Sequence, residues 1–362
     1  MGFVDEVGLG ESQGGRRPVE LKFNCAAGYV IGIEVTSQEI AIAIADLKNY
    51  PTDINRKSVD MSNPDLAIKA LVTMVEQIIH SEEHQGKKFF GVAIAFPGLL
   101  RVNEGIIKRS INLGKKWREF PLKAALENEV GLPVFIENNP KVATMGEKWF
   151  GGGTCSKNLI YINMGEGISA GIMLDDSIIQ GSQGFAGQIG HTVMIEQGPL
   201  CNCGNRGCLE AICGIPALLR KATEELSFIN TQDALRKHYE ATHQLHINDI
   251  IKIALLEESY AREIIRQAGQ YVALATANLI NIFNPDEVFI GGKLAVAGDI
   301  FIEEFRQIIN SHVFPEVGEA TAISISKLGG DSGVVGACAL ALKNLLKSSD
   351  SNMFEDSSDN SN

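Results

Sequence analysis

Two stretches of the sequence decide the fold: GYVIGIEVTSQEIAIAIADL at residues 28–47 and NLIYINMGEGISAGIMLDD at residues 158–176. Each consists of two apolar runs joined by a short polar or glycine-rich turn, a pattern that predicts a β-hairpin. Alternating helix and strand patterns follow both hairpins. They lie at residues 66–80, 89–95, 122–128 and 134–136 after the first hairpin, and at 215–282 and 287–290 after the second. The sequence therefore predicts a duplicated α/β fold, with a ligand-binding cleft between two similar domains.

The composition is that of a globular, acidic protein. Of 362 residues, 45% are apolar and 21% are charged, and 32 Lys and Arg against 44 Asp and Glu give a net charge of −12 at pH 7. This charge repels nucleic acid from the chain as a whole, so any contact with DNA has to be local. Because there is no apolar run of membrane-spanning length and no secretory signal at the N-terminus, we expect a cytoplasmic protein that does not bind membranes.

We divide the chain into four segments. These are an N-terminal segment (1–26), an N-terminal α/β domain (27–145), a C-terminal α/β domain with a cysteine-rich loop (146–346) and an unfolded acidic tail (347–362). The N-terminal segment places two β-prone runs around a basic Gly-Gly-Arg-Arg-Pro tip. The local pattern alone favours a surface hairpin or a frayed terminus. The alternative is a linker or remnant wing of a winged helix-turn-helix, in which Arg16 and Arg17 contact DNA.

Three closely spaced thiols, Cys201, Cys203 and Cys208, follow His191 in the pattern His-x9-Cys-x-Cys-x4-Cys. In a reducing compartment such crowding indicates a metal site before it indicates disulfide bonds. One nitrogen and three sulfur ligands complete a tetrahedral structural zinc site, which stabilises a loop and does not activate water. The alternative is a set of buried free cysteines beside a core histidine. The remaining thiols, which we predict to be ordinary core residues, are Cys25, Cys155, Cys213 and Cys338.

Polar side chains follow several of the predicted strands and turns. The motifs are Phe96-Pro97-Gly98, Asn112-Leu113-Gly114, Glu137-Asn138-Asn139 and Gly187 to His191. Amide and carboxylate groups of this kind suit neutral hydroxyl ligands such as sugars, since every buried polar group left unpaired costs about 1–3 kcal/mol. Taken singly, each of these residues is equally well explained as a turn or capping residue.

Five stretches carry a family resemblance. They are AFPGLL at 95–100, INLG at 111–114, IENNPKVATMGE at 136–147, GFAGQIGHTVMIEQGPLCNCGNRGCLEAICG at 184–214 and EVFIGG at 287–292. Together they resemble the ROK family of sugar kinases and sugar-responsive repressors, over residues 28 to about 345. The resemblance implies an α/β fold of the actin-like ATPase, hexokinase type, in which two domains enclose an interdomain cleft and one carries a structural zinc loop.

The same resemblance assigns ligands. It implies a zinc ion held by His191, Cys201, Cys203 and Cys208, and a sugar bound in the interdomain cleft. The positions that it implies for sugar binding are Asn112, Asn138, Asn139, Gln188, His191 and Glu210. Gln188 replaces the glutamate usual in the family, which keeps the hydrogen-bonding reach but changes the donors and acceptors that the sugar meets.

The chain departs from the family's kinases where ATP would be bound and used. Residues 34–38 are Glu-Val-Thr-Ser-Gln in place of Asp-x-Gly-Gly-Thr, whose glycines let the backbone approach phosphate. Glu166 stands where a small hydroxyl residue is typical, and its charge would repel phosphate. Asn139 replaces the aspartate that takes the proton from the sugar hydroxyl, a loss that typically costs about 10²- to 10⁴-fold in rate. We therefore assign no catalytic residue and do not expect Mg-ATP as a cofactor.

These observations predict the sugar-binding and dimerising region of a ROK-type transcriptional repressor without its helix-turn-helix, with the xylose repressors as the most similar subgroup. Family repressors carry a Gly-Gly-Arg-Arg-Pro segment before the sugar domain, which favours the wing interpretation of residues 14–18. The expected partners are a sugar and a second copy in a homodimer or larger assembly, with DNA only if a helix-turn-helix precedes this sequence. The rivals are an ATP-dependent, glucokinase-like sugar kinase with impaired catalysis, and a sugar-binding protein that acts through partner contacts.

Overall fold

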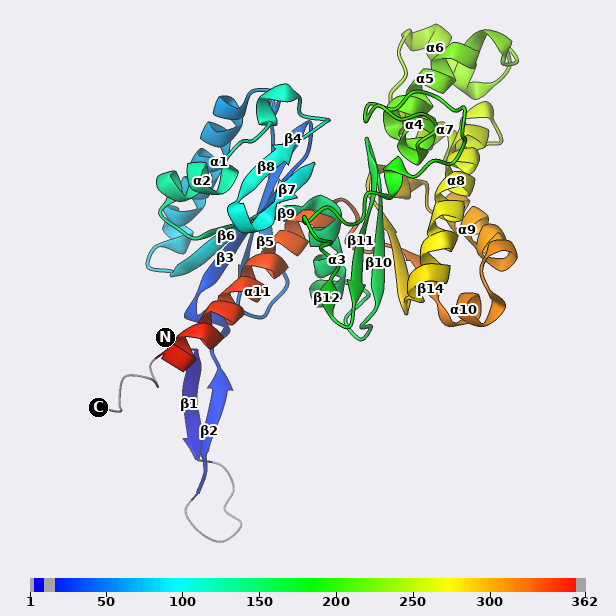
Figure 1. The fold of residues 1–362 in the computed structure, drawn as a ribbon. Helices are drawn as coiled ribbons and strands as arrows, with labels where there is room; N and C mark the ends of the chain where they lie inside the picture. Colours follow the sequence, from blue (N-terminus) through cyan, green and yellow to red (C-terminus); the bar gives the residue numbers. More distant parts are fainter. Residues whose placement is uncertain (1–2, 10–16, 356–362) are drawn as a thin grey trace. The chain divides into compact units, whose positions relative to one another are not determined.

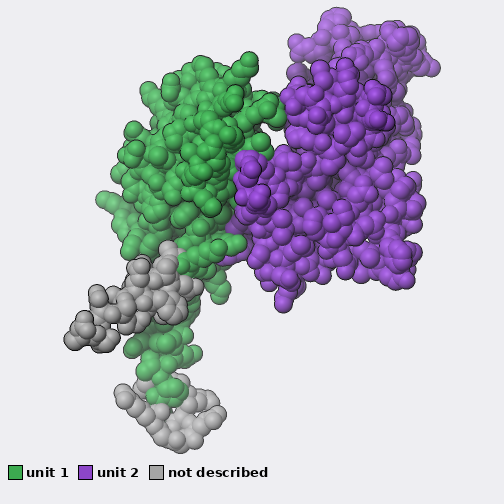
Figure 2. All heavy atoms as spheres, viewed as in Figure 1, with its two compact units in different colours: residues 1–139, 333–362 green, residues 140–332 purple. Residues whose placement is uncertain are grey.

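The computed structural model describes residues 3–9 and 17–355 (Figure 1). The chain forms two compact units (Figure 2): unit 1 comprises residues 1–139 and 333–362, and unit 2 comprises residues 140–332. Each unit is organised around one five-stranded sheet.

The two sheets have the same strand order, β5-β4-β3-β6-β9 in unit 1 and β12-β11-β10-β13-β14 in unit 2. In both, the first two strands of the sheet in sequence form an antiparallel hairpin, and the last two run parallel to the hairpin's first strand. The strands of unit 1 are β3 (Tyr29–Val35), β4 (Glu39–Asp46), β5 (Thr52–Ser58), β6 (Phe89–Phe96) and β9 (Val134–Asn138). Those of unit 2 are β10 (Leu159–Met164), β11 (Ile168–Leu174), β12 (Ser177–Ile178), β13 (Glu287–Gly291) and β14 (Ala322–Ile325). The predicted duplication of a hairpin-led α/β unit is confirmed.

Helices cover both faces of the sheet in unit 1. They are α1 (Pro64–Ile79), α2 (Leu122–Val130) and α11 (Ser332–Glu355), with β7 (Leu99–Arg101) and β8 (Ile106–Arg109) forming a small separate ribbon. Ile31 and Ile33 of β3 share one buried cluster with Leu71 of α1. Side chains alternate along a strand, so Gly32 faces the other way, where α11 packs against it. A Cβ on Gly32 would lie 2.6 Å from the backbone nitrogen of Cys338, so only glycine permits this approach.

Unit 2 contains the other helices. They are α3 (Asn139–Phe150), α4 (Leu209–Cys213), α5 (Ile215–Glu225), α6 (Ala234–Thr242), α7 (Ile247–Leu256), α8 (Tyr260–Phe283), α9 (Asp299–His312) and α10 (Pro315–Ala320). Ile160 and Ile162 of β10 pack in one cluster with α8, which is buried along much of its length as its apolar composition predicts. A strand glycine again lies under a helix, as Gly32 does in unit 1. Gly171 of β11 packs against α3, because a Cβ on this glycine would overlap Thr144 and Pro140 of that helix.

The N-terminal segment forms the predicted hairpin (Figure 1). Strands β1 (Val4–Leu9) and β2 (Val19–Phe23) pair antiparallel, and every described side chain of β2 is exposed, Leu21 to 62%. Arg17 is exposed immediately before β2, whereas Arg16 lies outside the described residues. At the other end of the chain α11 continues through Glu355, so only residues 356–362 of the tail predicted to be unfolded lie outside the described part.

Among residues 3–9 and 17–355, no helix is both long enough and apolar enough to cross a membrane.

Candidate functional site

In unit 1 the predicted sugar-binding asparagines gather at the ends of two parallel strands. Strands β6 and β9 pair in register up to Phe96 opposite Asn138, so the turn after β6 lies beside the start of α3. Asn138 is buried, and its Nδ2 donates to the carbonyl oxygen of Gly98 at 2.6 Å. Asn139 donates through Nδ2 to the carbonyl oxygen of Val35 at 3.0 Å. Parallel strands thus bring together motifs that lie about forty residues apart in the sequence.

Two buried polar atoms in this region have no hydrogen-bond partner among the described residues: Asn139 Oδ1 and Ser110 Oγ. Ser110 borders Gly98, since a Cβ on that glycine would lie 3.1 Å from the Cβ of Ser110. Asn138 and Ser110 therefore flank the same glycine from two sides. Buried polar groups in proteins are almost always paired, so these two atoms are available to a ligand or an ordered water. The sequence analysis missed Ser110, although it directly precedes the Ile111-Asn112-Leu113-Gly114 motif.

Asn112 is the outlying member of the predicted set in unit 1. It lies in an exposed turn between β8 and the short 3₁₀ helix Lys115–Trp117. The neighbouring Leu113 is buried and fixes that turn to the core. Asn112 is therefore presented to solvent on an anchored turn, a position open to a ligand.

The turn between β3 and β4 is closed by its own side chain. Thr36 Oγ1 accepts hydrogen bonds from the backbone nitrogens of Gln38 and Glu39, at 3.3 and 3.1 Å. The same hydroxyl donates to the carbonyl oxygen of Glu39 at 3.1 Å. These two N–H groups are the kind of backbone donors that would have to point at phosphate in a phosphate-binding turn, and here they are satisfied internally.

The first turn of α11 meets a carboxylate. A Cβ built on Gly333 would overlap the carboxylate of Glu34, which lies on β3. The N-terminus of a helix is a favourable site for an anion, because its free N–H groups and its dipole attract negative charge. Glu34 thus supplies an internal anion at a position where a phosphate could otherwise sit.

In unit 2 the predicted sugar-binding residues meet at the beginning of β11. Glu210, on α4, accepts a hydrogen bond from the backbone nitrogen of Ile168 at 3.2 Å. Gly190, within the 3₁₀ helix Ile189–His191, is so close that an added Cβ would overlap the carbonyl oxygen of Ile168 and approach Glu210. Gln188 begins this 3₁₀ helix, and its carbonyl oxygen accepts from the backbone nitrogen of His191 at 3.2 Å. The three residues predicted from this part of the sequence are therefore neighbours.

Burial raises the pKa of Glu210 above its ordinary value, and the charge of His191 opposes that rise. A carboxyl group held this way retains a proton at higher pH than an exposed glutamate does. The backbone hydrogen bond from Ile168 fixes one carboxylate oxygen of Glu210.

The predicted Cys and His residues form a compact group that could hold a metal ion. The ligand atoms of His191, Cys201, Cys203 and Cys208 all lie within 4.8 Å of one another. Cys203 Sγ lies 3.6 Å from Cys208 Sγ, and Cys201 Sγ lies 3.7 Å from His191 Nδ1. Burial raises the pKa of the Cys208 thiol to about 12, so a cation is needed to displace its proton near neutral pH.

Backbone turns bring these thiols together. The backbone nitrogen of Cys201 donates to the carbonyl oxygen of Asn205 at 2.8 Å, which closes a tight loop around Cys203. Gly207 has φ +71°, and a Cβ there would overlap the carbonyl oxygen of Ile195. The glycine is therefore required both by its backbone conformation and by the space available.

The prediction for the other four thiols is half right. Cys213 and Cys338 are buried, but Cys25 is only half-buried and Cys155 is exposed. Cys155 lies in the irregular segment between α3 and β10, and Cys25 in a 3₁₀ helix that leads from the N-terminal hairpin into β3. The exposure of these two thiols depends on the packing around each segment, which local sequence does not reveal.

Two further features lie away from the predicted residues. A second group of potential metal ligands in unit 1 consists of Asp53, Glu83 and His84. Both carboxylates are exposed, as surface acidic groups commonly are.

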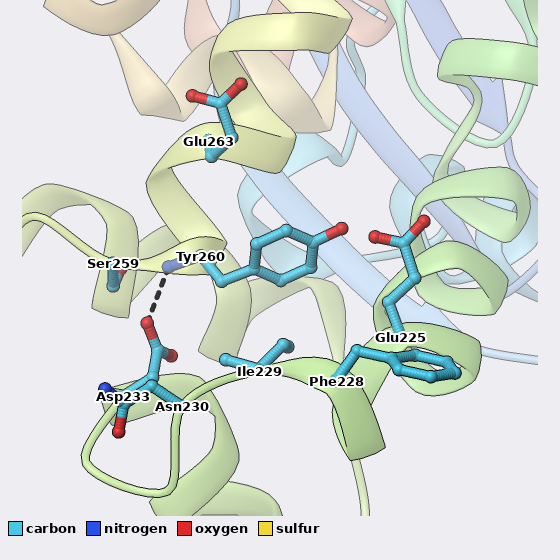
Figure 3. A pocket seen from close by; sticks show the side chains of 8 residues that line it. All are labelled: Glu225, Phe228, Ile229, Asn230, Asp233, Ser259, Tyr260 and Glu263. Atoms are coloured by element: carbon cyan, nitrogen blue, oxygen red, sulfur yellow. Dashed lines mark hydrogen bonds between the residues drawn. The ribbon is translucent and has the colours of Figure 1, made fainter.

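In unit 2 a pocket of about 410 Å³ opens between the ends of α5 and α8 (Figure 3). Its Asp233 accepts from the backbone nitrogens of Leu235 and Tyr260, both at 2.8 Å. That acid caps two helices, and none of the predicted sugar-binding residues lines the pocket.

The two hairpin-led units define a two-domain fold of the actin-like, sugar-kinase type. The sequence model of the ROK family matches residues 30–344, and the chain belongs to the ROK family. A putative xylose repressor of Caldicellulosiruptor sp. (strain Rt8B.4) is 33% identical over 357 residues, with 95% of this chain and 86% of the relative covered. A glucokinase of Halalkalibacterium halodurans is 35% identical over 258 residues, with 71% of this chain and 77% of the relative covered. The crystal structure of a ROK family transcriptional regulator, a homologue of the Escherichia coli MLC protein, matches with a TM-score of 0.82 at 25% identity, covering 95% of this chain and 85% of its own.

Proposed function

We propose that this chain is the sugar-binding effector region of a carbohydrate-responsive transcriptional repressor, with a pentose such as xylose as the first ligand to test. The similarity to a putative xylose repressor extends over 95% of the chain, whereas similarities to glucokinases extend over 71% to 87%. In such a regulator, sugar binds one conformational state better than another and thereby changes the affinity for DNA.

One observation carries the proposal: the residue at the family's general-base position is Asn139, and its buried Oδ1 lacks a hydrogen-bond partner among the described residues. An amide oxygen accepts a hydrogen bond but has no useful basicity near neutral pH. It can therefore bind a sugar hydroxyl without removing its proton. This is the behaviour required of a sensor, which has to release its ligand unchanged.

We propose a set of sugar-binding residues in each unit. Asn112, Asn138 and Asn139 belong to unit 1, and Gln188, His191 and Glu210 belong to unit 2. We add Ser110 to this set, because its buried hydroxyl oxygen is unpaired and it shares Gly98 with Asn138. Each unpaired atom that gains a sugar hydroxyl removes a desolvation penalty of about 1–3 kcal/mol.

The same region gives little support for phosphoryl transfer. The backbone donors of the β3–β4 turn are taken by Thr36, and Glu34 places a carboxylate against the first turn of α11. Since phosphoryl transfer depends on positioning and neutralising phosphate, both features weaken ATP binding. The glucokinase similarity keeps a sugar kinase as the second candidate function, and product formation separates the two.

We propose zinc as the ion held by His191, Cys201, Cys203 and Cys208. With Zn–S bonds of about 2.3 Å, two sulfurs of a tetrahedral site lie about 3.8 Å apart. The separations of 3.6 Å between Cys203 and Cys208 and 3.7 Å between Cys201 and His191 support this geometry. A site closed by four protein ligands supplies structural stability. It would hold His191, and through it Glu210, in place for the sugar.

The N-terminal hairpin fits the proposed role as the wing of a DNA-binding domain. Its exposed apolar residues Val4 and Leu21 support packing against another part of the full regulator, because an isolated two-stranded hairpin is marginal in water. Arg17 and Arg16 would then contact DNA.

We further propose that the protein acts as a homodimer or larger assembly, which sedimentation at several concentrations tests.

Calorimetric titration with a panel of neutral sugars, including xylose and glucose, tests the proposal. At least one sugar should bind with a Kd below about 1 mM, and Asn138→Ala should weaken it about tenfold or more because Gly98 loses its donor as well. The exposed Asn49→Ala on the β4–β5 connection is the matched control and should leave the affinity unchanged. Absence of binding by every sugar in the panel would overturn the proposal.

A further inference from the structure

A lysine is buried beside the residues proposed to bind sugar. Lys141 lies in the first turn of α3, two residues after Asn139, and only 1% of its surface is exposed. Its Nζ donates to Gln180 Oε1 at 2.7 Å and to the carbonyl oxygen of Gly184 at 2.6 Å. Both acceptors belong to one loop, residues 179–188, which connects β12 to Gln188 and the 3₁₀ helix containing His191.

Backbone hydrogen bonds to β11 anchor the loop at 179–188 near its two ends: the nitrogen of Ile179 donates to the oxygen of Ile172, and the nitrogen of Ala170 donates to the oxygen of Gly187, both at 2.8 Å. Gly181, Gly184 and Gly187 all have positive φ, so the loop loses much backbone freedom when it adopts this conformation. Between these two anchored ends, the nitrogen of Gly184 donates to the oxygen of Gly181 at 3.3 Å, and the nitrogen of Ala186 donates to the oxygen of Gln180 at 3.1 Å. Its outer residues, 180–183, are exposed. The hydrogen bonds from Lys141 to Gln180 and Gly184 therefore hold the part of the loop that lies between its anchored ends.

The ammonium of Lys141 is an expensive way to supply that contact. Removing a charged ammonium from water costs several kcal/mol unless hydrogen bonds compensate. A leucine or methionine in the same place would fill the space at lower cost, but it could not bind Gln180 and Gly184. Hydrogen bonds from a charged donor are directional and stronger than neutral ones, so they fix the position of the loop as well as its packing.

We propose that Lys141 is a positioning residue for the sugar site. It ties the start of α3, which directly follows Asn138 and Asn139, to the loop that ends at Gln188. The segments on both sides of this tie carry proposed sugar ligands, so the lysine sets the placement of Gln188 without touching the sugar. This inference rests on the proposed sugar-binding function and gives a role to Lys141, which lies inside the motif at 136–147 but to which the sequence analysis assigned none.

The same helix provides a matched control. Lys148, on the last turn of α3, donates through Nζ to the carbonyl oxygen of Ser156 at 2.8 Å and forms an ion pair with Asp176 at 2.7 Å. Like Lys141 it links α3 to a loop through an ammonium, but its loops lie at 154–156 and 175–176, away from Gln188. A general structural role of lysine on α3 would affect both variants equally.

The experiment compares Lys141→Met and Lys148→Met in the full chain by amide hydrogen exchange, thermal unfolding and calorimetry with the sugar that the wild type binds. Lys141→Met should speed exchange of the Ala186 amide about tenfold and weaken sugar binding about tenfold. Lys148→Met should change both by less than about twofold while lowering the unfolding temperature to a similar extent. In the double variant with Gln180→Leu, the loss of affinity should be less than the product of the single effects.

Unchanged affinity of Lys141→Met, with a wild type that binds sugar, would overturn the inference and leave the proposed function intact. Equal losses in Lys141→Met and Lys148→Met would also overturn it, because they would reveal a general loss of stability. A wild type that binds no sugar would instead overturn the proposed function, and the inference with it. If Lys141→Met fails to fold, Gln180→Leu alone tests the same contact, and an affinity within twofold of wild type contradicts the proposal.

Discussion

The two units share a strand order but treat their polar groups in opposite ways. At the strand ends of unit 1, Asn139 Oδ1 and Ser110 Oγ are buried and unpaired. In unit 2, at the start of β11 and in the loop after β12, Glu210 is held by the backbone of Ile168, and Lys141 by Gln180 and Gly184. The proposed sugar ligands thus differ: Asn139 and Ser110 in unit 1 carry unpaired buried atoms, whereas Glu210 in unit 2 is already held by a hydrogen bond. A duplicated fold therefore does not imply a duplicated site.

The largest loss of stability should come from disrupting the proposed metal site of unit 2, formed by the Cys and His group. Cys203→Ser, or treatment with a chelator, should lower the unfolding temperature by about 10 °C or more, because a structural metal contributes directly to folding free energy. Sugar affinity should fall with it, since His191 is shared between the two roles. Metal content, calorimetric unfolding and sugar titration measure this.

Cys155→Ser is the matched control, because that thiol is exposed and outside the group. It should change neither the unfolding temperature nor the bound metal. An unchanged unfolding temperature in Cys203→Ser, with no metal bound to the wild type, would remove the basis for treating unit 2 as a metal-fixed scaffold.

In unit 1 we expect a smaller effect, in which sugar affinity falls while the stability of the sugar-free protein does not. Ser110→Ala removes an unpaired buried hydroxyl, so the unfolding free energy of the sugar-free protein should stay constant or rise by about 0.5–1 kcal/mol. Sugar affinity should nevertheless fall about five- to tenfold, because the hydroxyl pairs only when the ligand is present. Urea unfolding and calorimetry measure the two quantities, with Ser58→Ala, exposed on β5, as the control. Affinity equal to wild type would exclude Ser110 from the site.

The smallest expected effect is on the pH dependence of stability, and it concerns Glu147, an acid that is fully buried in unit 2. Glu147 accepts hydrogen bonds from Ser326 and from the backbone nitrogen of Gly152, at 3.0 Å for the latter. Burial raises its pKa, although the hydrogen bonds from Ser326 and Gly152 oppose the rise. The folded state therefore binds this proton more tightly than the unfolded state. The resulting stabilisation is complete below the ordinary glutamate pKa and is lost as pH rises through the raised value.

Replacing this acid tests that sign. The unfolding free energy of Glu147→Gln, relative to wild type, should increase as pH rises from about 4 to 8, since the variant has no carboxylate to ionise. Sugar affinity should not depend on this substitution. A difference between the two proteins that stays constant over this range would contradict the raised pKa.

Local sequence was sufficient for much of the fold, and long-range packing explains the remainder. The hairpins at 28–47 and 158–176 are recognisable because apolar runs and turn residues are local signals, and the thiol group is recognisable because its spacing is short. The packing of α11 on Gly32 depends on a contact between residues about 300 positions apart. No local pattern assigns the helix to that sheet.

In the candidate site, too, some residues were recognisable from local sequence and others only from their long-range contacts. The asparagines of the Glu-Asn-Asn motif stood out because they follow an apolar strand. Ser110 and Lys141 did not, because an unpaired hydroxyl and a buried ammonium acquire their meaning only from neighbours far away in sequence. The same applies to Thr36. The sequence indicated a turn that binds phosphate poorly, and the structure shows that the Thr36 hydroxyl accepts the backbone hydrogen bonds that a phosphate would need.

The central claim is that the chain binds sugar without phosphorylating it, and release of ADP from Mg-ATP at a saturating concentration of the bound sugar tests it most directly. The account predicts turnover at least about 10²-fold below the usual kinase range, because Asn139 cannot act as the general base. Turnover at or above about 1 s⁻¹ would contradict it and make the protein a sugar kinase.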